Sequence, residues 1–295
     1  ERAMIAAISG ANEMADSAQQ SQAQSWDFGR GLRCYKWPAS AARANVLLTH
    51  GFAEYAERYV EHYHRLIPRL NALGFDVYGF DLQGHGRSPG ARGVADLKKS
   101  VADHQAARRA LSADGKPLFC FGHSLGGLIT AASVAEDGKG VAGVILSAPA
   151  LLIEAPAHLR AIANIFAVLS PGLRLLPASD ASAISRIDAE VQAYKTDPMI
   201  SALSIPAKVG ATAIATAEKA WTRYPQWTAP VLVLHGEKDT LTDPNGSKRF
   251  FELIAAKDKR LELYPEGRHE LLNDLDRDAA MDVLTSWLSA HVTAR

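Results

Sequence analysis

Continuous runs of apolar residues, without alternating polar positions, recur along the chain from residue 44 onward. Such runs are typical of strands that are buried on both faces of a sheet. Stretches with helical periodicity separate most of them, for example residues 59–73 and 97–111. Because buried strands alternate with helices, the pattern predicts an α/β fold with a mostly parallel sheet. The expected strands are residues 44–50, 75–80, 117–123, 141–148, 230–236 and 260–265.

The segment before the first apolar run has a different character. Residues 1–24 include a stretch rich in Gln, Ser and Ala, and we expect them to form a mobile arm. Residues 25–37 contain two short strand-like runs around Gly29 and Gly31, which predicts a hairpin. The apolar part of the arm is short and no basic segment precedes it, so a signal peptide is not expected. The expected location is the cytoplasm, with peripheral attachment to a membrane surface left open.

One connection between predicted strands is far longer than the others. It runs from residue 148 to residue 229, whereas connections in α/β units usually add only a few residues to their helix. Its opening part places Leu159, Ile162, Phe166 and Leu169 on one helical face. That face fits either a helix docked on the core or a cap over an active site. The connection leaves the sheet at its C-terminal edge, where ligands bind in open α/β folds, and this position favours a cap. The predicted organisation is a core of residues 25–149 and 227–295 with an inserted cap of residues 150–226.

Composition and charge narrow the classes of partner. Lys+Arg and Asp+Glu both number 32, so no basic field is present to hold a nucleic acid. Hydrophobic residues make up 47% and charged residues 22%, which is ordinary for a globular protein. No apolar stretch reaches the length of a membrane span. Cys34 and Cys120 are expected to be free thiols, and neither a CxxC nor an HExxH motif occurs, so no metal site is expected.

A serine stands between glycines directly after one of the predicted strands. Residues 122–126 read Gly-His-Ser-Leu-Gly and match G-x-S-x-G. The match alone also fits a Gly-rich turn without chemistry, but a strand leads into it and a helix of small residues follows, which is the context of a nucleophile elbow. The glycines allow a turn tight enough to lift the Ser124 hydroxyl above the sheet edge. A serine hydroxyl also needs a positioned base.

The acid of a catalytic triad is expected after the strand at residues 230–236, because this fold orders its triad as serine, carboxylate, histidine. Glu237, Asp239 and Asp243 are the candidates there. Asp239 is favoured because it lies in the loop directly beyond the strand end, and Glu237 is the second choice. Asp243 precedes a proline and is typical of a helix N-cap.

The base is expected after the last strand. His269 lies in that loop, and only His291, near the chain end, comes after it. The oxyanion of acyl transfer further needs two backbone N–H donors. Leu125 is expected to supply one and Phe52, in the loop after the strand at residues 44–50, the other. Gly51 in that loop lets the chain pass close to the serine.

Several segments together resemble one known family. From about His50 to the C-terminus the chain is similar to the α/β-hydrolases, and within them to the monoacylglycerol lipase and lysophospholipase-like branch. The similarity rests on HGFAEYAERY (residues 50–59), GFDLQGHGRSPGARG (79–93), GHSLGG (122–127), ISRIDAEVQAYKTDP (184–198), HGEKDTLTDPNGSKRFFE (235–252) and YPEGRHELLNDL (264–275).

The resemblance implies a serine ester hydrolase that needs no cofactor or metal, with Ser124, Asp239 and His269 as its triad. It also implies four polar residues around the glyceryl head of a monoacylglycerol: Glu54, Arg58, His123 and Tyr194. Taken alone, these residues equally fit an i,i+4 pair of Glu54 with Arg58, packing of His123 under the elbow, and a place for Tyr194 in the cap core. The chain departs from the family at Phe52, where a small residue is usual, and at Tyr55, where His is usual.

The expected reaction is hydrolysis of a monoacylglycerol to fatty acid and glycerol through an acyl-enzyme. Alternatives are a lysophospholipase, a carboxylesterase for other single-chain esters, and a serine aminopeptidase in which Glu54 anchors the amino group. A non-catalytic binding protein is disfavoured, because it has no need of all three triad residues. The partner is therefore a small lipid ester, with transient membrane or micelle contact through the cap left open. The oligomeric state is not predicted.

Overall fold

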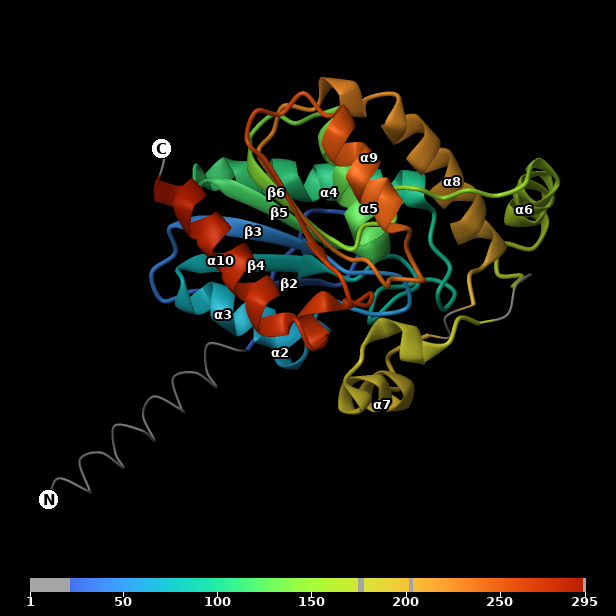
Figure 1. The fold of residues 1–295 in the computed structure, drawn as a ribbon, viewed down its shortest axis with the longest axis horizontal. Coiled ribbons are helices and arrows are strands. Elements are labelled where there is room, and N and C mark those ends of the chain that lie inside the picture. The colour runs from blue at the N-terminus through green and yellow to red at the C-terminus, as the bar shows by residue number, and fades with distance from the viewer. Residues whose placement is uncertain (1–21, 175–177, 202–203, 294–295) are drawn as a thin grey trace, which may run out of the picture.

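The computed structural model describes residues 22–174, 178–201 and 204–293. Within them lies one eight-stranded sheet with the order β1-β2-β4-β3-β5-β6-β7-β8 (Figure 1). β2 runs antiparallel to both β1 and β4, and all other neighbours are parallel, which confirms the predicted fold class. The strands are β1 Gln24–Ser25, β2 Cys34–Trp37, β3 Ala44–Thr49, β4 Phe75–Phe80, β5 Leu118–His123, β6 Val141–Ser147, β7 Val231–Gly236 and β8 Lys259–Tyr264.

The first described residues form the predicted hairpin. Gln24 pairs with Lys36 and Ser25 with Tyr35, so β1 begins at the last residue of the expected arm. The rest of the predicted mobile arm, up to residue 21, lies outside the described residues. All six strands expected from apolar runs are present.

The described α-helices mostly follow the predicted periodicity. The helix expected at residues 97–111 is present with the same bounds. The α-helices are α2 Arg58–Glu61, α3 Leu66–Ala72, α4 Leu97–Leu111, α5 Ser124–Glu136, α6 Ala157–Leu169, α7 Asp188–Thr196, α8 Ala207–Trp221, α9 Pro244–Leu253 and α10 Arg277–Thr293.

The single helix predicted at residues 59–73 is wrong. The chain there forms α2, the 3-10 helix η1 (Tyr63–Arg65) and α3. Tyr63, His64 and Arg65 have φ angles of 54°, 53° and 55°, in the left-handed region that interrupts an α-helix. The backbone N–H of Tyr63 donates to the side chain of Asn273, and its ring stacks on Tyr59 with the centroids 3.9 Å apart. Contacts with a distant part of the chain hold this break, so local periodicity carries no sign of it.

Helices cover both faces of the sheet. Figure 1 shows α4 and α5 on one face and α3 and α10 on the other. Side chains along β3 alternate between the two: Leu47 packs in one hydrophobic cluster, and Val46 and Leu48 pack in the other. Each face therefore has its own core, as expected for strands without polar positions. Cys34 and Cys120 are buried free thiols, as predicted.

The long connection at residues 150–226 contributes α6, the 3-10 helix η3 (Ala181–Ile184), α7 and α8. α8 packs against α4 and α5, whereas α6 and α7 lie beyond the end of the sheet (Figure 1). Of the α6 side chains only Ala167 is buried, while Val168 and Leu169 are 79% and 75% exposed. The apolar face of α6 is therefore not docked on the core. The division into a core and a cap remains a prediction.

Among the described helices, none combines the length and the apolar character needed to cross a bilayer.

Candidate active site

Ser124 is the first residue of α5, at the point where β5 ends. Its φ is 53°, a left-handed conformation that costs a non-glycine residue about 1–2 kcal/mol. The neighbouring glycines make the turn feasible, because a Cβ on Gly126 would lie 2.2 Å from the carbonyl oxygen of Thr49, and one on Gly122 would lie 2.6 Å from Thr130 Oγ1. α5 thereby packs closely against β3. The strand, the strained turn and the helix have the geometry of a nucleophile elbow.

His269 and Asp239 come together from the loops after β8 and β7. His269 Nδ1 lies 2.7 Å from Asp239 Oδ2, and a proton on Nδ1 leaves Nε2 free to accept one. The carboxylate is itself held firmly: Oδ1 accepts the N–H groups of Leu241 and Thr242 at 2.8 and 3.0 Å, and Thr242 Oγ1 donates to Oδ2 at 2.6 Å. These bonds fix the direction in which the acid meets the imidazole.

The pKa values of this pair follow from burial and mutual charge. Burial by itself lowers the pKa of His269, but the charge of Asp239 and its hydrogen bond outweigh burial and raise the pKa above its ordinary value of 6.5. Burial likewise raises the pKa of Asp239, yet His269 and His235 hold it well below its usual range. Asp239 is therefore ionised at neutral pH and stabilises the imidazolium form of His269.

The rival carboxylates and the second histidine lie in other surroundings. Glu237 is exposed and pairs with Lys248 Nζ at 2.8 Å. Asp243 caps α9, as expected, by accepting the N–H of Asn245 at 2.9 Å. His291 stacks on a tryptophan ring and bonds to Asp258. Among these candidates, only Asp239 is hydrogen-bonded to His269 in the described structure.

A narrow pocket of about 100 Å³ opens at this edge of the sheet. Ser124 and His269 both line it, together with the predicted head-group residues His123 and Tyr194. Burial, and then the charge of His269, lowers the pKa of His123 to about 4, so its ring is neutral at neutral pH. The remaining lining residues are Gly51, Phe52, Glu54, Ser179, Ile184, Ile205, Leu241 and Glu270.

The two candidate oxyanion donors belong to segments that meet beside the serine. A Cβ on Gly51 would lie 3.1 Å from Ser124 Cβ, so the loop after β3 passes directly alongside Ser124. Phe52 follows at the pocket wall, with its ring edge-on to His85. Leu125 lies in the first turn of α5, where backbone N–H groups have no partner within the helix.

Arg58 lies beneath this pocket and does not line it. Its side chain is 1% exposed, and Nη1 lies 3.1 Å from Glu54 Oε2, so the i,i+4 pair is present although Glu54 precedes α2. The guanidinium also holds both carboxylate oxygens of Glu270, at 2.9 and 3.0 Å. Glu270 was not among the predicted site residues, although its place directly after the candidate base His269 was a signal. Burial raises the pKa of Glu270, but Arg58 outweighs it and lowers the pKa to about 2.

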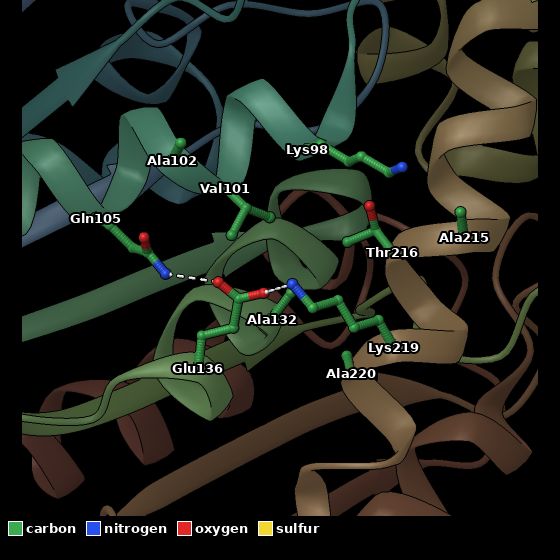
Figure 2. Close-up of a pocket in the computed structure, with 10 residues that line it drawn as sticks. All are labelled: Lys98, Val101, Ala102, Gln105, Ala132, Glu136, Ala215, Thr216, Lys219 and Ala220. Carbon is green, nitrogen blue, oxygen red and sulfur yellow. Dashed lines mark hydrogen bonds and ion pairs between the residues drawn. The ribbon is translucent and has the colours of Figure 1, made fainter.

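A larger hollow of about 260 Å³ lies between α4, α5 and α8 (Figure 2). Glu136 crosses it, with Gln105 Nε2 at 2.9 Å on one side and Lys219 Nζ at 2.6 Å on the other. None of the predicted catalytic residues lines it. The candidate active-site pocket is therefore identified by the residues that line it and not by its volume.

Comparisons with known proteins agree with this geometry. The profile of the family described as serine aminopeptidase, S33 (Hydrolase_4) matches residues 40–276. Monoacylglycerol lipase of Mycolicibacterium smegmatis is 35% identical over 86% of this chain and 91% of its own length. Monoglyceride lipase of Homo sapiens is 30% identical over 88% of each chain. The crystal structure of Paleococcus ferrophilus monoacylglycerol lipase is similar at a TM-score of 0.79, with 33% identity over 88% of this chain and 99% of that one.

Proposed function

The chain belongs to the serine aminopeptidase S33 (Hydrolase_4) family of α/β-hydrolases, and from this premise we propose that it cleaves monoacylglycerols to fatty acid and glycerol. It is a serine hydrolase of the carboxylic-ester class. The observation that carries the proposal is the convergence of Ser124 and His269 on one pocket, with Asp239 bonded behind the imidazole. Such a constellation serves acyl transfer from an ester.

In the proposed mechanism, His269 Nε2 takes the proton of the Ser124 hydroxyl as its oxygen attacks the ester carbonyl. Asp239 keeps the imidazole in the required tautomer and stabilises its charged form. The N–H groups of Phe52 and Leu125 stabilise the oxyanion. His269 then gives its proton to the departing glycerol oxygen, and a water molecule releases the fatty acid by the same steps.

We propose that the polar wall of the pocket binds the glyceryl head. His123 and Tyr194 line the pocket with aromatic groups that can hydrogen-bond to hydroxyls. Glu54 also lines it, but its oxygens are engaged within the protein, so it shapes the wall, and Arg58, which does not line the pocket, holds both Glu54 and Glu270. On the other side, Ile184, Ile205 and Leu241 supply an apolar surface for the start of an acyl chain. The small volume of the pocket favours a glyceride with one acyl chain over those with two or three.

A serine aminopeptidase is the second candidate, and the surroundings of Glu54 argue against it. An amino terminus would need a carboxylate with free acceptor capacity. Glu54 Oε1 already accepts from the Gly51 N–H and the Tyr59 hydroxyl, at 2.6 and 2.8 Å. Its Oε2 accepts from Arg58 and from the Tyr63 hydroxyl, at 3.1 and 2.9 Å. These four bonds leave little acceptor capacity on Glu54 for a substrate ammonium group.

We further propose that the protein attaches peripherally to lipid surfaces through α6. Although α6 packs against α8, five of its large apolar side chains remain exposed in the described structure: Leu159, Ile162, Ile165, Val168 and Leu169 are 39–79% exposed. An amphipathic helix with such a face partitions into a membrane interface. Attachment there would bring the pocket to a substrate that is poorly soluble in water.

The nucleophile and the substrate class are tested separately. Ser124→Ala should abolish labelling by a fluorophosphonate without changing the thermal unfolding midpoint, whereas Ser179→Ala, at the other serine of the pocket wall, should still be labelled. A panel of monoacylglycerols, diacylglycerols, triacylglycerols, lysophospholipids and aminoacyl amides should give the highest kcat/KM for a monoacylglycerol. Persistent labelling of Ser124→Ala would refute the assignment of Ser124 as the nucleophile. A higher kcat/KM for a lysophospholipid or an amide would refute the proposed substrate class.

A further inference from the structure

The loop that carries Phe52 adopts a backbone that its own residues do not favour. Ala53 has a φ of 71°, in the region that favours glycine. The core holds this loop at two points: Glu54 Oε1 accepts the N–H of Gly51 at 2.6 Å, and Asp81 Oδ1 accepts the N–H of Ala56 at 2.9 Å. The bond from Gly51 is local, but the Glu54 side chain that accepts it is held by the Tyr59 and Tyr63 hydroxyls, and Asp81 holds Ala56 from 25 residues away. Contacts beyond the loop therefore help to determine where the Phe52 N–H lies.

Two further contacts reach this loop from the insertion at residues 150–226. The N–H of Ser201 donates to the carbonyl oxygen of Ala53 at 2.9 Å. The hydroxyl of Tyr55 donates to Asp197 Oδ2 at 2.7 Å, across a separation of 142 residues in sequence. The insertion thus holds the loop at the residue directly after Phe52 and again two residues further on.

Asp197 joins these two contacts into one unit. It directly follows α7, and its other oxygen, Oδ1, accepts the N–H of Met199 at 2.7 Å, which orders the turn that leads to Ser201. Burial, and then the hydrogen bond to Asp197, raises the pKa of the Tyr55 hydroxyl above its ordinary value. Tyr55 is therefore a protonated donor across the neutral range, and the bond to a carboxylate is of the strong, charge-assisted kind.

We infer that Tyr55 and Asp197 are positioning residues that couple the insertion to the oxyanion loop. With the pair intact, the seated insertion holds Ala53 in its left-handed conformation and keeps the Phe52 N–H available to the pocket. Neither Tyr55 nor Asp197 is among the residues that line the pocket, so both act through the loop. The inference rests on the proposed function, because it takes Phe52 as an oxyanion donor. Seating of the insertion and completion of the oxyanion hole are then one event.

The test compares Tyr55→Phe, which loses one oxygen atom, with Asp197→Ala and Asp197→Asn. Activity on p-nitrophenyl butyrate is expressed per site titrated with a fluorophosphonate. We expect Tyr55→Phe and Asp197→Ala to lower kcat about tenfold, less than the 10²–10³-fold loss of a whole donor, with little change in KM. Asp197→Asn keeps one acceptor oxygen, which can serve the Tyr55 hydroxyl only if the Met199 N–H loses its partner, so its kcat should lie between those of Asp197→Ala and the wild type.

Two readouts separate positioning from general damage. The affinity for a trifluoromethyl ketone, whose adduct carries an oxyanion, should fall in parallel with kcat/KM, while the affinity for the product butyrate should not change. Because the Tyr55 hydroxyl acts through its bond to Asp197, the double variant Tyr55→Phe/Asp197→Ala should be no slower than Asp197→Ala alone. Tyr264→Phe is the matched control: the Tyr264 hydroxyl is buried without a hydrogen-bond partner among the described residues, so kcat should not change.

Four results would overturn the coupling. Two concern kcat of single variants: a value within about twofold of the wild type in Tyr55→Phe, or a loss in Asp197→Asn as large as in Asp197→Ala. The others are additive losses of kcat in the double variant, and an equal loss of affinity for the ketone and for butyrate. If Asp197→Ala does not fold, Tyr55→Phe and Asp197→Asn carry the test. Failure of the proposed function is seen separately: the wild-type protein would not be titrated by the fluorophosphonate, or it would prefer a lysophospholipid or an amide to a monoacylglycerol.

Discussion

The carboxylate that is hydrogen-bonded to the His269 imidazole is itself held by several hydrogen bonds. Asp239 meets the ring at 2.7 Å while two backbone N–H groups and the Thr242 hydroxyl hold it from the other sides. The energetic consequence is that the charged form of His269 is favoured despite burial. At the scale of single residues, the chemistry of the pocket is thus determined by which groups face each other and how deeply they are buried.

The fall of kcat/KM at low pH should reflect the pKa of His269 in its pair with Asp239. His269 must be neutral to accept the Ser124 proton, and its pKa is raised, so wild-type kcat/KM should fall as the pH drops through a midpoint above 6.5. Asp239→Asn removes the charge that raises the pKa but leaves the burial that lowers it. Its acid limb should lie at lower pH, and its kcat should be about 10⁴-fold lower because the tautomer is no longer enforced. The profile is measured with p-nitrophenyl acetate.

Glu237→Gln is the control for this change, because Glu237 is an exposed carboxylate in the same loop that pairs with Lys248. Its profile should match that of the wild type. An acid limb at the same pH in Asp239→Asn and the wild type would contradict the assignment of the acid.

Tyr194 tests the head-group side of the pocket. Its ring packs 5.0 Å from the Arg58 guanidinium, and Tyr194→Phe keeps this ring while removing the hydroxyl. One lost hydrogen bond of about 0.5–1.5 kcal/mol should lower kcat/KM for a monoacylglycerol roughly two- to tenfold. The p-nitrophenyl ester of the same fatty acid has no glyceryl group and should be spared. Equal losses on both substrates would make Tyr194 a structural residue.

At the scale of elements, the junction of β3 and α5 positions Ser124 together with the Leu125 N–H, the proposed oxyanion donor. α5 approaches β3 so closely that Gly126 faces the carbonyl oxygens of Thr49 and His50 directly. The same helix carries Leu125 at its first turn. A shift of α5 away from the sheet would therefore move the nucleophile and the Leu125 N–H at once.

Gly126→Ala should produce that shift. The new Cβ would meet backbone oxygens at 2.2 and 2.3 Å, which side-chain rotation cannot relieve. We expect a loss of about 3 kcal/mol in the free energy of unfolding, at the upper end for overpacking, together with loss of fluorophosphonate labelling. Urea unfolding measures the first and gel fluorescence the second.

Gly138→Ala is the matched control just beyond the other end of α5, because its Cβ would make only an ordinary contact of 3.5 Å with the Val134 carbonyl oxygen. It should retain both stability and labelling. A Gly126→Ala protein as stable and as reactive as Gly138→Ala would show that the close approach of α5 is not required.

At the scale of the whole molecule, apolar surface is distributed unevenly. The sheet buries its side chains in two cores, one on each face, while α6 keeps a row of large aliphatic side chains in contact with solvent. Exposed apolar surface gathered on one helix is typical of a site that meets another apolar phase. This arrangement connects the proposed substrate class with the proposed lipid attachment.

Val168→Glu/Leu169→Glu should separate attachment from chemistry. Burial of each aliphatic side chain in lipid contributes about 1.5–3 kcal/mol, so hydrolysis of monoacylglycerol in phosphatidylcholine vesicles should fall at least tenfold. Hydrolysis of soluble p-nitrophenyl acetate should not change, and neither should the unfolding midpoint, since both side chains are already exposed.

Leu253→Glu offers a control on α9, where the leucine is 40% exposed. It should leave vesicle hydrolysis unchanged. Vesicle activity of the α6 variant equal to that of Leu253→Glu would argue against attachment through α6.

The strands of the sheet and the chain order of the candidate triad could be predicted without a folded structure. Strands such as β3 and β5 are encoded in continuous apolar runs, because a strand covered on both faces needs no polar position. The preference for Asp239 over Asp243 was also local, since a residue before proline at a helix start is an N-cap, and Asp243 does cap α9. Buried strands and N-caps depend on neighbours within a few residues, so they can be predicted from the sequence of one chain.

Features that join distant segments became visible only in the folded chain. The helix expected at residues 59–73 breaks because Asn273 bonds to the Tyr63 backbone from 210 residues away. Arg58 lies beneath the pocket because Glu270, 212 residues along the chain, draws its guanidinium there. Tyr55 bonds to Asp197 and α6 remains exposed for the same reason: which side chains meet depends on how the elements pack. Local periodicity reports which face of an element is apolar, but not what covers that face.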